Sequence, residues 1–176
     1  MTDTLSADAK RLNDILDRET IRETLYNIAS GVDRFDPKTL AAAIWDDAIL
    51  DMGGGKTIAG SDFINALKPP VTPPKGRMHI VTNIRIRIDH ETSVTESLIL
   101  SCQQLVTPDG ERTRLRAGRY LDRFEKRGDL WKLSARTLVD EWAREDEVDQ
   151  TPPTGEHRGA PAPHDLVQKL FYNEGR

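Results

Sequence analysis

Four long runs of alternating residues in the second half of the chain constrain its fold more than any other feature. The first begins at Arg77 and reads RMHIVTNIRIRID, so every second side chain lies on the same face of an extended strand. Turn residues separate it from three further runs. These cover residues 93–106, 112–126 and 130–140. Long strands joined by short turns predict an antiparallel meander.

The residues before Arg77 have mainly helical periodicity. In Thr20–Asp36 the apolar side chains recur at spacings of three and four, which is typical of a helix with one buried face. Asp17 is a suitable N-cap for this helix and separates it from a shorter helix at 6–16. Further expected elements are helices at 38–45 and 62–67, a turn at 46–47, a strand at 48–52 and a glycine turn at 53–56. This order predicts an α+β fold with helices on one face of a curved sheet.

The composition favours a globular protein and argues against several classes of function. The chain has 176 residues and a net charge of −4, which gives no electrostatic reason to expect a nucleic-acid partner. No apolar run approaches the roughly 20 residues of a membrane span, and the polar N-terminus is unlike a secretory signal. Cys102 is the single cysteine, so an internal disulfide is impossible. We therefore expect a cytoplasmic protein that binds neither nucleic acid nor membranes.

The C-terminal residues differ in composition from the rest of the chain. Residues 143–176 are first charged and then rich in proline and glycine (TPPTGEHRGAPAP), which predicts a tail without a core of its own. The preceding residues, 1–142, are expected to form one domain. Within the tail, residues 165–172 can form a short amphipathic helix. This helix has three possible roles: docking on its own subunit, capping a pocket or joining a partner.

Two residues with the chemistry of acids and bases occupy unusual positions. Asp33 lies on the edge of the apolar stripe of its helix, where a carboxylate is costly unless a partner holds it or it acts at the rim of a cavity. Tyr26, seven residues earlier, points within roughly 20° of the same direction. His79 shares its strand face with Asn83 and two arginines, and imidazole titrates near neutral pH. Taken singly, Asp33 also fits a solvated helix end and His79 a half-exposed strand position.

Other polar residues have simpler interpretations. Arg136 alternates with Leu133, so on a regular strand it lies on the opposite face, as a surface arginine. Asp122, which lies beside Arg119 and Arg123, is expected to form a cross-strand charge pair. The four histidines and one cysteine lack the spacing of metal ligands, so we expect no metal site.

Three segments together resemble a known family. They are GVDRFDPKTLAAAIWDDAILD, RMHIVTNIRIRI and GRYLDRFEKRGDLWKLSARTLVDEW. In order and spacing they are similar to the SnoaL-like branch of the nuclear transport factor 2-like superfamily, over about residues 10–142. This resemblance implies a cone-shaped barrel of three N-terminal helices packed on a strongly curved mixed β-sheet that encloses a pocket. It also implies a homodimer or homotrimer.

The resemblance implies particular site residues. It is strongest to the cofactor-free dehydratases and dehydrochlorinases, which use an Asp–His pair that matches Asp33 and His79 here. Arg136 matches an arginine that binds or orients the substrate or leaving group. Ile28 stands where dehydrochlorinases have a lysine and bile-acid dehydratases a tyrosine, which argues against either substrate. Leu50 replaces a pocket tryptophan of the dehydrochlorinases.

The expected substrate pocket therefore has catalytic and binding residues. The catalytic pair is Asp33 and His79, and the expected substrate-binding residues are Tyr26, Arg136, Asn83, Leu50 and Trp45. In this scheme the carboxylate orients the imidazole, which removes or shuttles a proton inside a water-poor cavity.

The main hypothesis is a cofactor-independent lyase that acts on a hydrophobic cyclic or aromatic small molecule. The reaction is dehydration, dehydrohalogenation or loss of formaldehyde, and it needs no metal, flavin or nicotinamide. One alternative is a non-catalytic ligand-binding protein, or an accessory protein like the β subunits of aromatic-ring dioxygenases. Another is an isomerase of the ketosteroid type, which needs a tyrosine and a protonated acid directed at one point.

Overall fold

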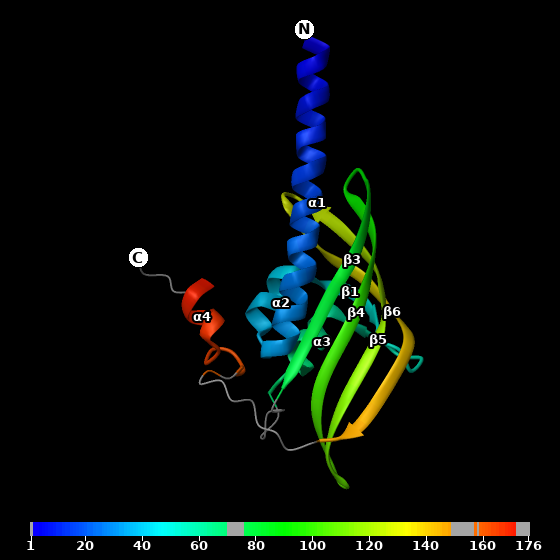
Figure 1. Cartoon of the computed structure of the whole chain (residues 1–176). Coiled ribbons are helices and arrows are strands. Elements are labelled where there is room, and N and C mark those ends of the chain that lie inside the picture. Colours follow the sequence, from blue (N-terminus) through cyan, green and yellow to red (C-terminus); the bar gives the residue numbers. More distant parts are fainter. Residues whose placement is uncertain (1, 70–75, 149–156, 158, 172–176) are drawn as a thin grey trace.

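The structure, a computed structural model, describes residues 2–69, 76–148, 157 and 159–171, and it has an α+β fold (Figure 1). Its elements are α1 (Thr2–Arg34), α2 (Pro37–Ala43), β1 (Ile44–Asp51), β2 (Thr57–Ala59), α3 (Gly60–Ala66), β3 (Arg77–Asp89), β4 (Thr92–Thr107), β5 (Gly110–Arg127), β6 (Leu130–Glu147) and α4 (Leu166–Phe171). The six strands form one curled sheet in the order β2-β1-β6-β5-β4-β3. Because β1 runs parallel to β6 and the other neighbours are antiparallel, the sheet is mixed. The predicted α+β fold with a curved mixed sheet is confirmed.

Helix α1 runs without interruption through the predicted boundary at Asp17, so the prediction of two separate helices is wrong. The Asp17 carboxylate accepts hydrogen bonds from the Trp131 indole nitrogen at 2.8 Å and from Lys126 Nζ at 3.0 Å. Its partners lie on β6 and β5, respectively. A side chain expected to cap a helix therefore attaches the middle of α1 to the sheet.

The segment between α1 and β2 departs from the prediction by a few residues. Helix α2 ends at Ala43, and the expected turn at Asp46–Asp47 lies inside β1. Asp36 caps α2, because its carboxylate accepts from backbone N–H groups of the first turn and Pro37 fills the first helical position. Gly53–Gly55 all have positive φ, which glycine adopts readily, and they form the predicted turn between β1 and β2.

A β-bulge in β3 changes which side chains face the core. The pairing with β4 shifts register around Asn83, whose φ is 51°. One extra residue in a strand reverses the faces of the residues that follow it. As a result, His79 before the bulge and Ile84 after it both lie on the inner face. Arg85 and Arg87 lie on the outer face with Met78 and Ile80, so the predicted grouping of His79 with two arginines is wrong.

The main hydrophobic core lies between the helices and the inner face of the sheet. Its largest fully buried side chains are Ile21, Leu25, Ile28, Leu40, Ile44, Leu50, Phe124 and Leu133. Each large apolar side chain that leaves water contributes about 1.5–3 kcal/mol to folding. This burial fixes the C-terminal half of α1 against β3 and β6.

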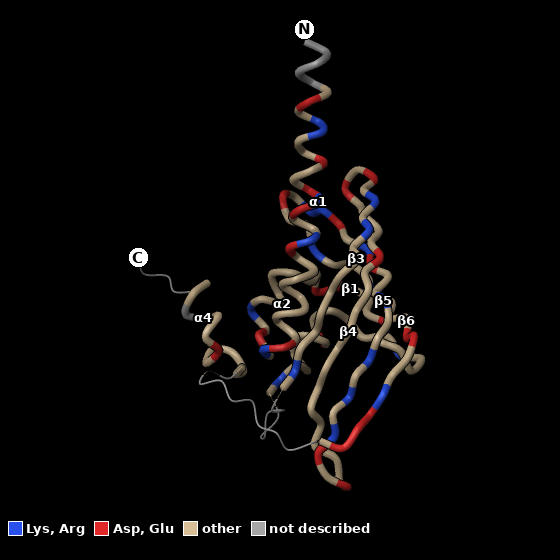
Figure 2. Tube along the Cα trace, viewed as in Figure 1, with Lys and Arg blue, Asp and Glu red and all other residues tan. Residues whose placement is uncertain are grey.

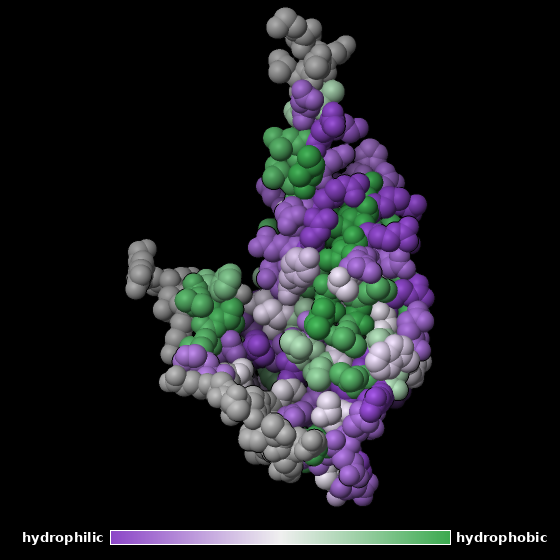
Figure 3. All heavy atoms as spheres, in the orientation of Figure 1, coloured by the Kyte–Doolittle hydropathy of each residue, from purple (hydrophilic) through white to green (hydrophobic). Residues whose placement is uncertain are grey.

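Apolar side chains also gather on the outer face of the sheet, where the space-filling view shows a green area over the strands (Figure 3). Its exposed members include Met78, Ile80, Leu98 and Leu100. Contiguous apolar surface of this kind is typical of protein interfaces. The homodimer or homotrimer remains a prediction. If it forms, the outer apolar face of the sheet is a candidate for the contact between subunits.

The C-terminal part of the chain returns to the end of α1. Strand β6 continues past residue 142 to Glu147. After residues 149–156, which lie outside the described residues, the Asp165 carboxylate pairs with Arg34 at 3.0 Å and Gln168 donates to Asp36 at 2.9 Å. Of the three possible roles of the tail helix, these contacts support docking on its own subunit.

Candidate active site

Asp33 and His79 meet where the end of α1 crosses the beginning of β3, although they are 46 residues apart. Nδ1 of His79 lies 2.6 Å from Oδ1 of Asp33, and the backbone N–H of His79 donates to Oδ2 at 2.8 Å. Each of the two side chains is about 10% exposed. An ionised carboxylate only accepts hydrogen bonds, so this contact favours a proton on Nδ1, and in the neutral form of the ring Nε2 is then an acceptor.

A cavity of about 190 Å³ lies beside the imidazole, between α1, α3 and the inner face of the sheet. Its apolar lining is Val32, Met52, Phe63, Ile99 and Leu138. Its polar lining is His79, Ser101, Gln103, Tyr120 and four arginines at positions 77, 114, 116 and 136. This volume equals the liquid volume of about six water molecules, so it suits a small ligand. Asp33 is not part of the lining and lies behind the ring that it contacts.

Arg136 lies on the inner face because of a second bulge. The pairing between β5 and β6 shifts at Ser134, so Arg136 is on the same face as Leu133 and is only 6% exposed. The prediction of an outward-facing Arg136 is therefore wrong. Its Nε and Nη2 donate to the two carboxylate oxygens of Asp122 at 2.8 and 2.7 Å. Asp122 thus forms the predicted cross-strand charge pair, with Arg136 on the neighbouring strand.

The Asp122–Arg136 pair is buried and ionised. Burial raises the pKa of Asp122, and the adjacent Arg136 guanidinium acts in the opposite direction. A bidentate contact of this geometry requires two acceptor oxygens, so the carboxylate is charged at neutral pH. Arg136 keeps Nη1 without a hydrogen bond to any residue in the described part of the chain, and it lines the cavity.

Tyr120 is a cavity residue that the sequence did not single out. The Arg136 guanidinium lies 3.8 Å from the centroid of its ring. Burial raises the pKa of the Tyr120 hydroxyl, so it is protonated at neutral pH and can donate a hydrogen bond. The alternation of Tyr120 and Asp122 along β5 was visible in the sequence. Only the fold shows that their shared face is a cavity wall.

Four of the five expected substrate-binding residues do not line this cavity. Tyr26 is 47% exposed, because seven residues along α1 place it about 10 Å from Asp33 along the helix axis. Asn83 is at the exposed bulge in β3. Leu50 is fully buried in the main core.

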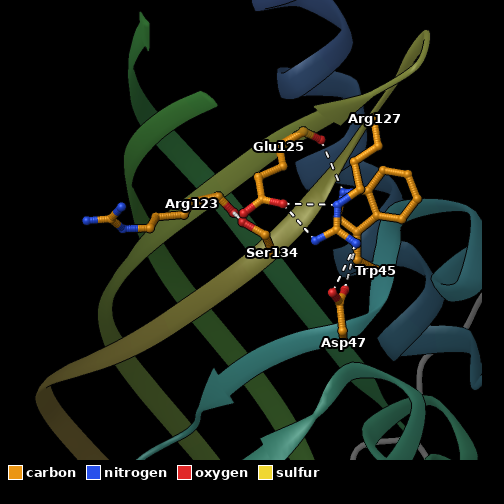
Figure 4. A network of polar contacts seen from close by, with 6 residues as sticks. All are labelled: Trp45, Asp47, Arg123, Glu125, Arg127 and Ser134. Carbon is orange, nitrogen blue, oxygen red and sulfur yellow. Dashed lines mark hydrogen bonds and ion pairs between the residues drawn. The ribbon is translucent and has the colours of Figure 1, made fainter. Parts of the chain in front are cut away.

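Trp45, the fourth, lies at a different edge of the sheet, as the close-up shows (Figure 4). Its indole N–H donates to the backbone carbonyl of Glu125 at 3.1 Å, and the Arg127 guanidinium stacks 4.7 Å from its ring. Arg127 is held in turn by Asp47 and Glu125. These contacts attach β1 to the end of β5, so Trp45 has a structural role.

A larger hollow of about 610 Å³ lies on the outer face of the sheet. Its outward-facing residues include Arg85, Arg87, Leu121 and Arg123. The thickness of the sheet separates it from the Asp33–His79 pair, so of these two hollows only the inner cavity lies beside that pair. In the part of the chain that the structure describes, no three His, Cys, Asp or Glu side chains are grouped to hold a metal ion. No described helix is long and apolar enough to cross a membrane.

Comparison with protein families gives one clear assignment. The family model of the SnoaL-like domain matches residues 13–137. This segment begins within α1 and ends within β6, and it contains Asp33, His79 and Arg136. The chain belongs to the SnoaL-like domain family. No functionally curated protein matches it significantly in sequence.

Several solved structures have a similar fold. Hexachlorocyclohexane dehydrochlorinase LinA type 2 is 24% identical, with a TM-score of 0.71, over 82% of this chain and 99% of that one. The type 3 enzyme from Novosphingobium barchaimii is 22% identical, with a TM-score of 0.68, over 81% and 99%. Protein Kfla4162 from Kribbella flavida is 21% identical, with a TM-score of 0.67, over 74% and 95%. At these identities the comparisons establish the fold of the SnoaL-like protein described here.

Proposed function

We propose that this SnoaL-like protein is a cofactor-independent lyase in which His79 is the base. The observation that carries the proposal is the 2.6 Å contact between His79 Nδ1 and Asp33, beside a cavity that His79 lines. The contact leaves Nε2 available to accept a proton. The likeness of the fold to that of solved dehydrochlorinases supports an elimination reaction. The substrate is a small hydrophobic molecule, cyclic or aromatic, in keeping with the apolar side chains of the lining.

In the proposed reaction Nε2 of His79 takes a proton from a C–H group of the substrate. The electron pair of that bond forms a double bond, and the leaving group departs with its own bonding pair as hydroxide or halide. For loss of formaldehyde Nε2 takes the proton of a hydroxymethyl O–H group, and the electron pair of that bond forms the C=O bond of formaldehyde. The pair of the broken C–C bond stays on the substrate carbon, to which the imidazolium returns the proton. Asp33 stabilises the imidazolium that forms and holds its ring in place. A well-placed base accelerates such a step by about 10²–10⁴-fold.

Two cavity residues have supporting roles in this scheme. The Tyr120 hydroxyl is protonated at neutral pH, so it can donate a hydrogen bond to the departing group. Arg136 can direct its free Nη1 to the same group while Asp122 holds the rest of the guanidinium. This arrangement disfavours the ketosteroid-type isomerase, because Asp122 is ionised by its pair with Arg136 and cannot be the protonated acid.

A test of the base does not require the natural substrate. The probe is 5-nitrobenzisoxazole, a small aromatic compound that opens to a coloured nitrophenolate when a base removes its ring C–H proton. We expect the wild-type protein to open it faster than free imidazole at the same concentration, and His79→Gln to lose about 10²-fold or more of this rate. Tyr26→Phe is the matched control outside the cavity. Equal rates for wild type and His79→Gln would show that His79 is not the base.

A further inference from the structure

Arg77 differs from the other arginines of the cavity in having no anionic partner in the described part of the chain. Three of the four arginine side chains in the lining are paired: Arg136 with Asp122, Arg116 with Asp140 and Arg114 with Glu145. The last two pairs join β5 to β6, where Figure 2 shows basic residues on one strand beside acidic residues on the other. The charges of these three guanidinium groups are therefore compensated by protein carboxylates.

The Arg77 side chain contacts an aromatic ring instead of a carboxylate. Its guanidinium lies 4.9 Å from the centroid of the Phe35 ring, and its Nε is buried without a hydrogen-bond partner among the described residues. A buried donor that has lost its water and gained no partner destabilises the fold, and a charged one does so more strongly. The protein therefore maintains an unfavourable arrangement at the wall of the cavity.

The Asp33 carboxylate interacts electrostatically with Arg77, but both of its oxygens already contact His79. One oxygen contacts the imidazole and the other accepts the backbone N–H of the same residue. Burial lowers the pKa of Arg77, and the charge of Asp33, which acts in the opposite direction from a distance, only partly offsets this. No hydrogen bond connects the two residues in the structure, so the donors of Arg77 remain available to a ligand.

The position of Arg77 relates it directly to the proposed base. Both residues are on β3, two positions apart and before the bulge, so their side chains leave the same face about 7 Å apart. Both line the same cavity. A ligand group bound by Arg77 would thus lie about 7 Å, the spacing of two strand residues, from the group that His79 deprotonates.

We propose that Arg77 binds a carboxylate of the substrate. A guanidinium offers parallel N–H donors that match the two oxygens of a carboxylate, and the apolar lining leaves the rest of the ligand in contact with carbon. The substrate class is then a small ring compound that carries a carboxylate, with its reactive C–H turned toward His79. The orientation of the C–H group rests on the proposed lyase function, whereas the carboxylate site stands on the geometry of Arg77 alone.

The test compares phenylacetate with phenylacetamide, which has nearly the same shape without the charge. Binding is measured by calorimetric titration of the full-length protein. We expect phenylacetate to bind about tenfold tighter or more, and Arg77→Met to lose this preference while Arg77→Lys keeps part of it. Arg87→Met, at an exposed arginine of the outer face, is the matched control and should keep the full preference.

The outcomes separate this inference from the proposed function. His79→Gln should keep the preference for phenylacetate even though it loses the opening of 5-nitrobenzisoxazole. If that rate does not depend on His79 but the preference depends on Arg77, the lyase proposal fails and the carboxylate site holds. Equal affinities of the wild type for the two compounds, or an unchanged preference in a folded Arg77→Met, would overturn the carboxylate site. If Arg77→Met does not fold, the wild-type comparison and Arg77→Lys still give this answer.

Discussion

Two buried carboxylates of this protein form contacts of nearly equal length with very different partners. Asp33 contacts the imidazole of His79 at 2.6 Å, and Asp122 contacts the guanidinium of Arg136 at 2.7 Å. Arginine keeps its charge at any pH that a protein experiences, whereas imidazole gains and loses a proton near neutral pH. The first pair can therefore take part in proton transfer, and the second can only hold a charge in place.

The surroundings of the two pairs follow the same division. The side chains of Asp122 and Arg136 are 0% and 6% exposed, and their contact connects the neighbouring strands β5 and β6. Asp33 and His79 are each about 10% exposed and connect a helix end to the beginning of a strand beside the cavity. The buried Asp122–Arg136 pair thus stabilises the sheet. In our proposal, the Asp33–His79 pair takes part in the reaction.

The largest expected effect on stability comes from breaking the structural pair. Asp122→Leu leaves the Arg136 charge buried without its partner, which should lower the free energy of unfolding by about 3–5 kcal/mol. Denaturant unfolding measures this. The double variant Asp122→Leu with Arg136→Met should recover most of the loss, because no buried charge remains. A single variant as stable as the wild type would mean that the pair does not hold the sheet.

Breaking the other pair should affect turnover more than stability. Asp33→Asn keeps the size of the side chain, and we expect a loss of about 1–2 kcal/mol in the free energy of unfolding from the weakened contacts with His79. The rate of opening of 5-nitrobenzisoxazole should fall about 10²-fold, as for loss of the base. If Asp33→Asn loses stability as severely as Asp122→Leu and keeps its rate, the two pairs have the same role.

A third carboxylate gives a smaller, pH-dependent effect. Burial raises the pKa of Asp36, but hydrogen bonds from Thr39, Gln168 and Lys38 outweigh it and hold this pKa below its usual value. The unfolded pKa is about 3.9. The stabilisation is thus present above that pH and is lost as the pH falls through the folded pKa. Acid unfolding followed by circular dichroism should show a flatter pH dependence for Asp36→Asn than for the wild type, and an unchanged profile would contradict this.

The smallest effect is expected at Tyr26. Its ring is half exposed and lies outside the cavity, so Tyr26→Phe should change the free energy of unfolding by no more than about 0.5 kcal/mol. Its rate with 5-nitrobenzisoxazole should match that of the wild type. A large loss of rate would mean that the helix presents Tyr26 to the substrate, contrary to the structure.

Periodicity was sufficient to predict much of the fold and part of the site. The strand runs and the helix that carries Asp33 follow from residue spacing, and the expectation that Asp33 and His79 meet came from the family resemblance. Spacing failed where a strand has an extra residue. The bulges near Asn83 and Ser134 reverse the faces of the residues after them, so Arg85, Arg87 and Arg136 were placed on the wrong side.

The remaining failures have a different cause. Asp17 has the identity of an N-cap, but its partners are side chains more than a hundred residues away, which local sequence does not show. Tyr120 and Arg77 were missed because an ordinary strand residue becomes a cavity residue only when the sheet curls around α1. Local propensity predicts elements, whereas the lining of a cavity depends on how distant elements meet.

The central claim is that Asp33 presents Nε2 of His79 to the cavity as a base. The most direct measurement is the ¹⁵N NMR spectrum of the imidazole of His79 in the wild-type protein at neutral pH, assigned with His79→Gln. We predict a neutral ring with the proton on Nδ1, facing Asp33, and an unprotonated Nε2. A neutral ring with the proton on Nε2, or a ring protonated at both nitrogens, would contradict the claim, because neither leaves a base in the cavity.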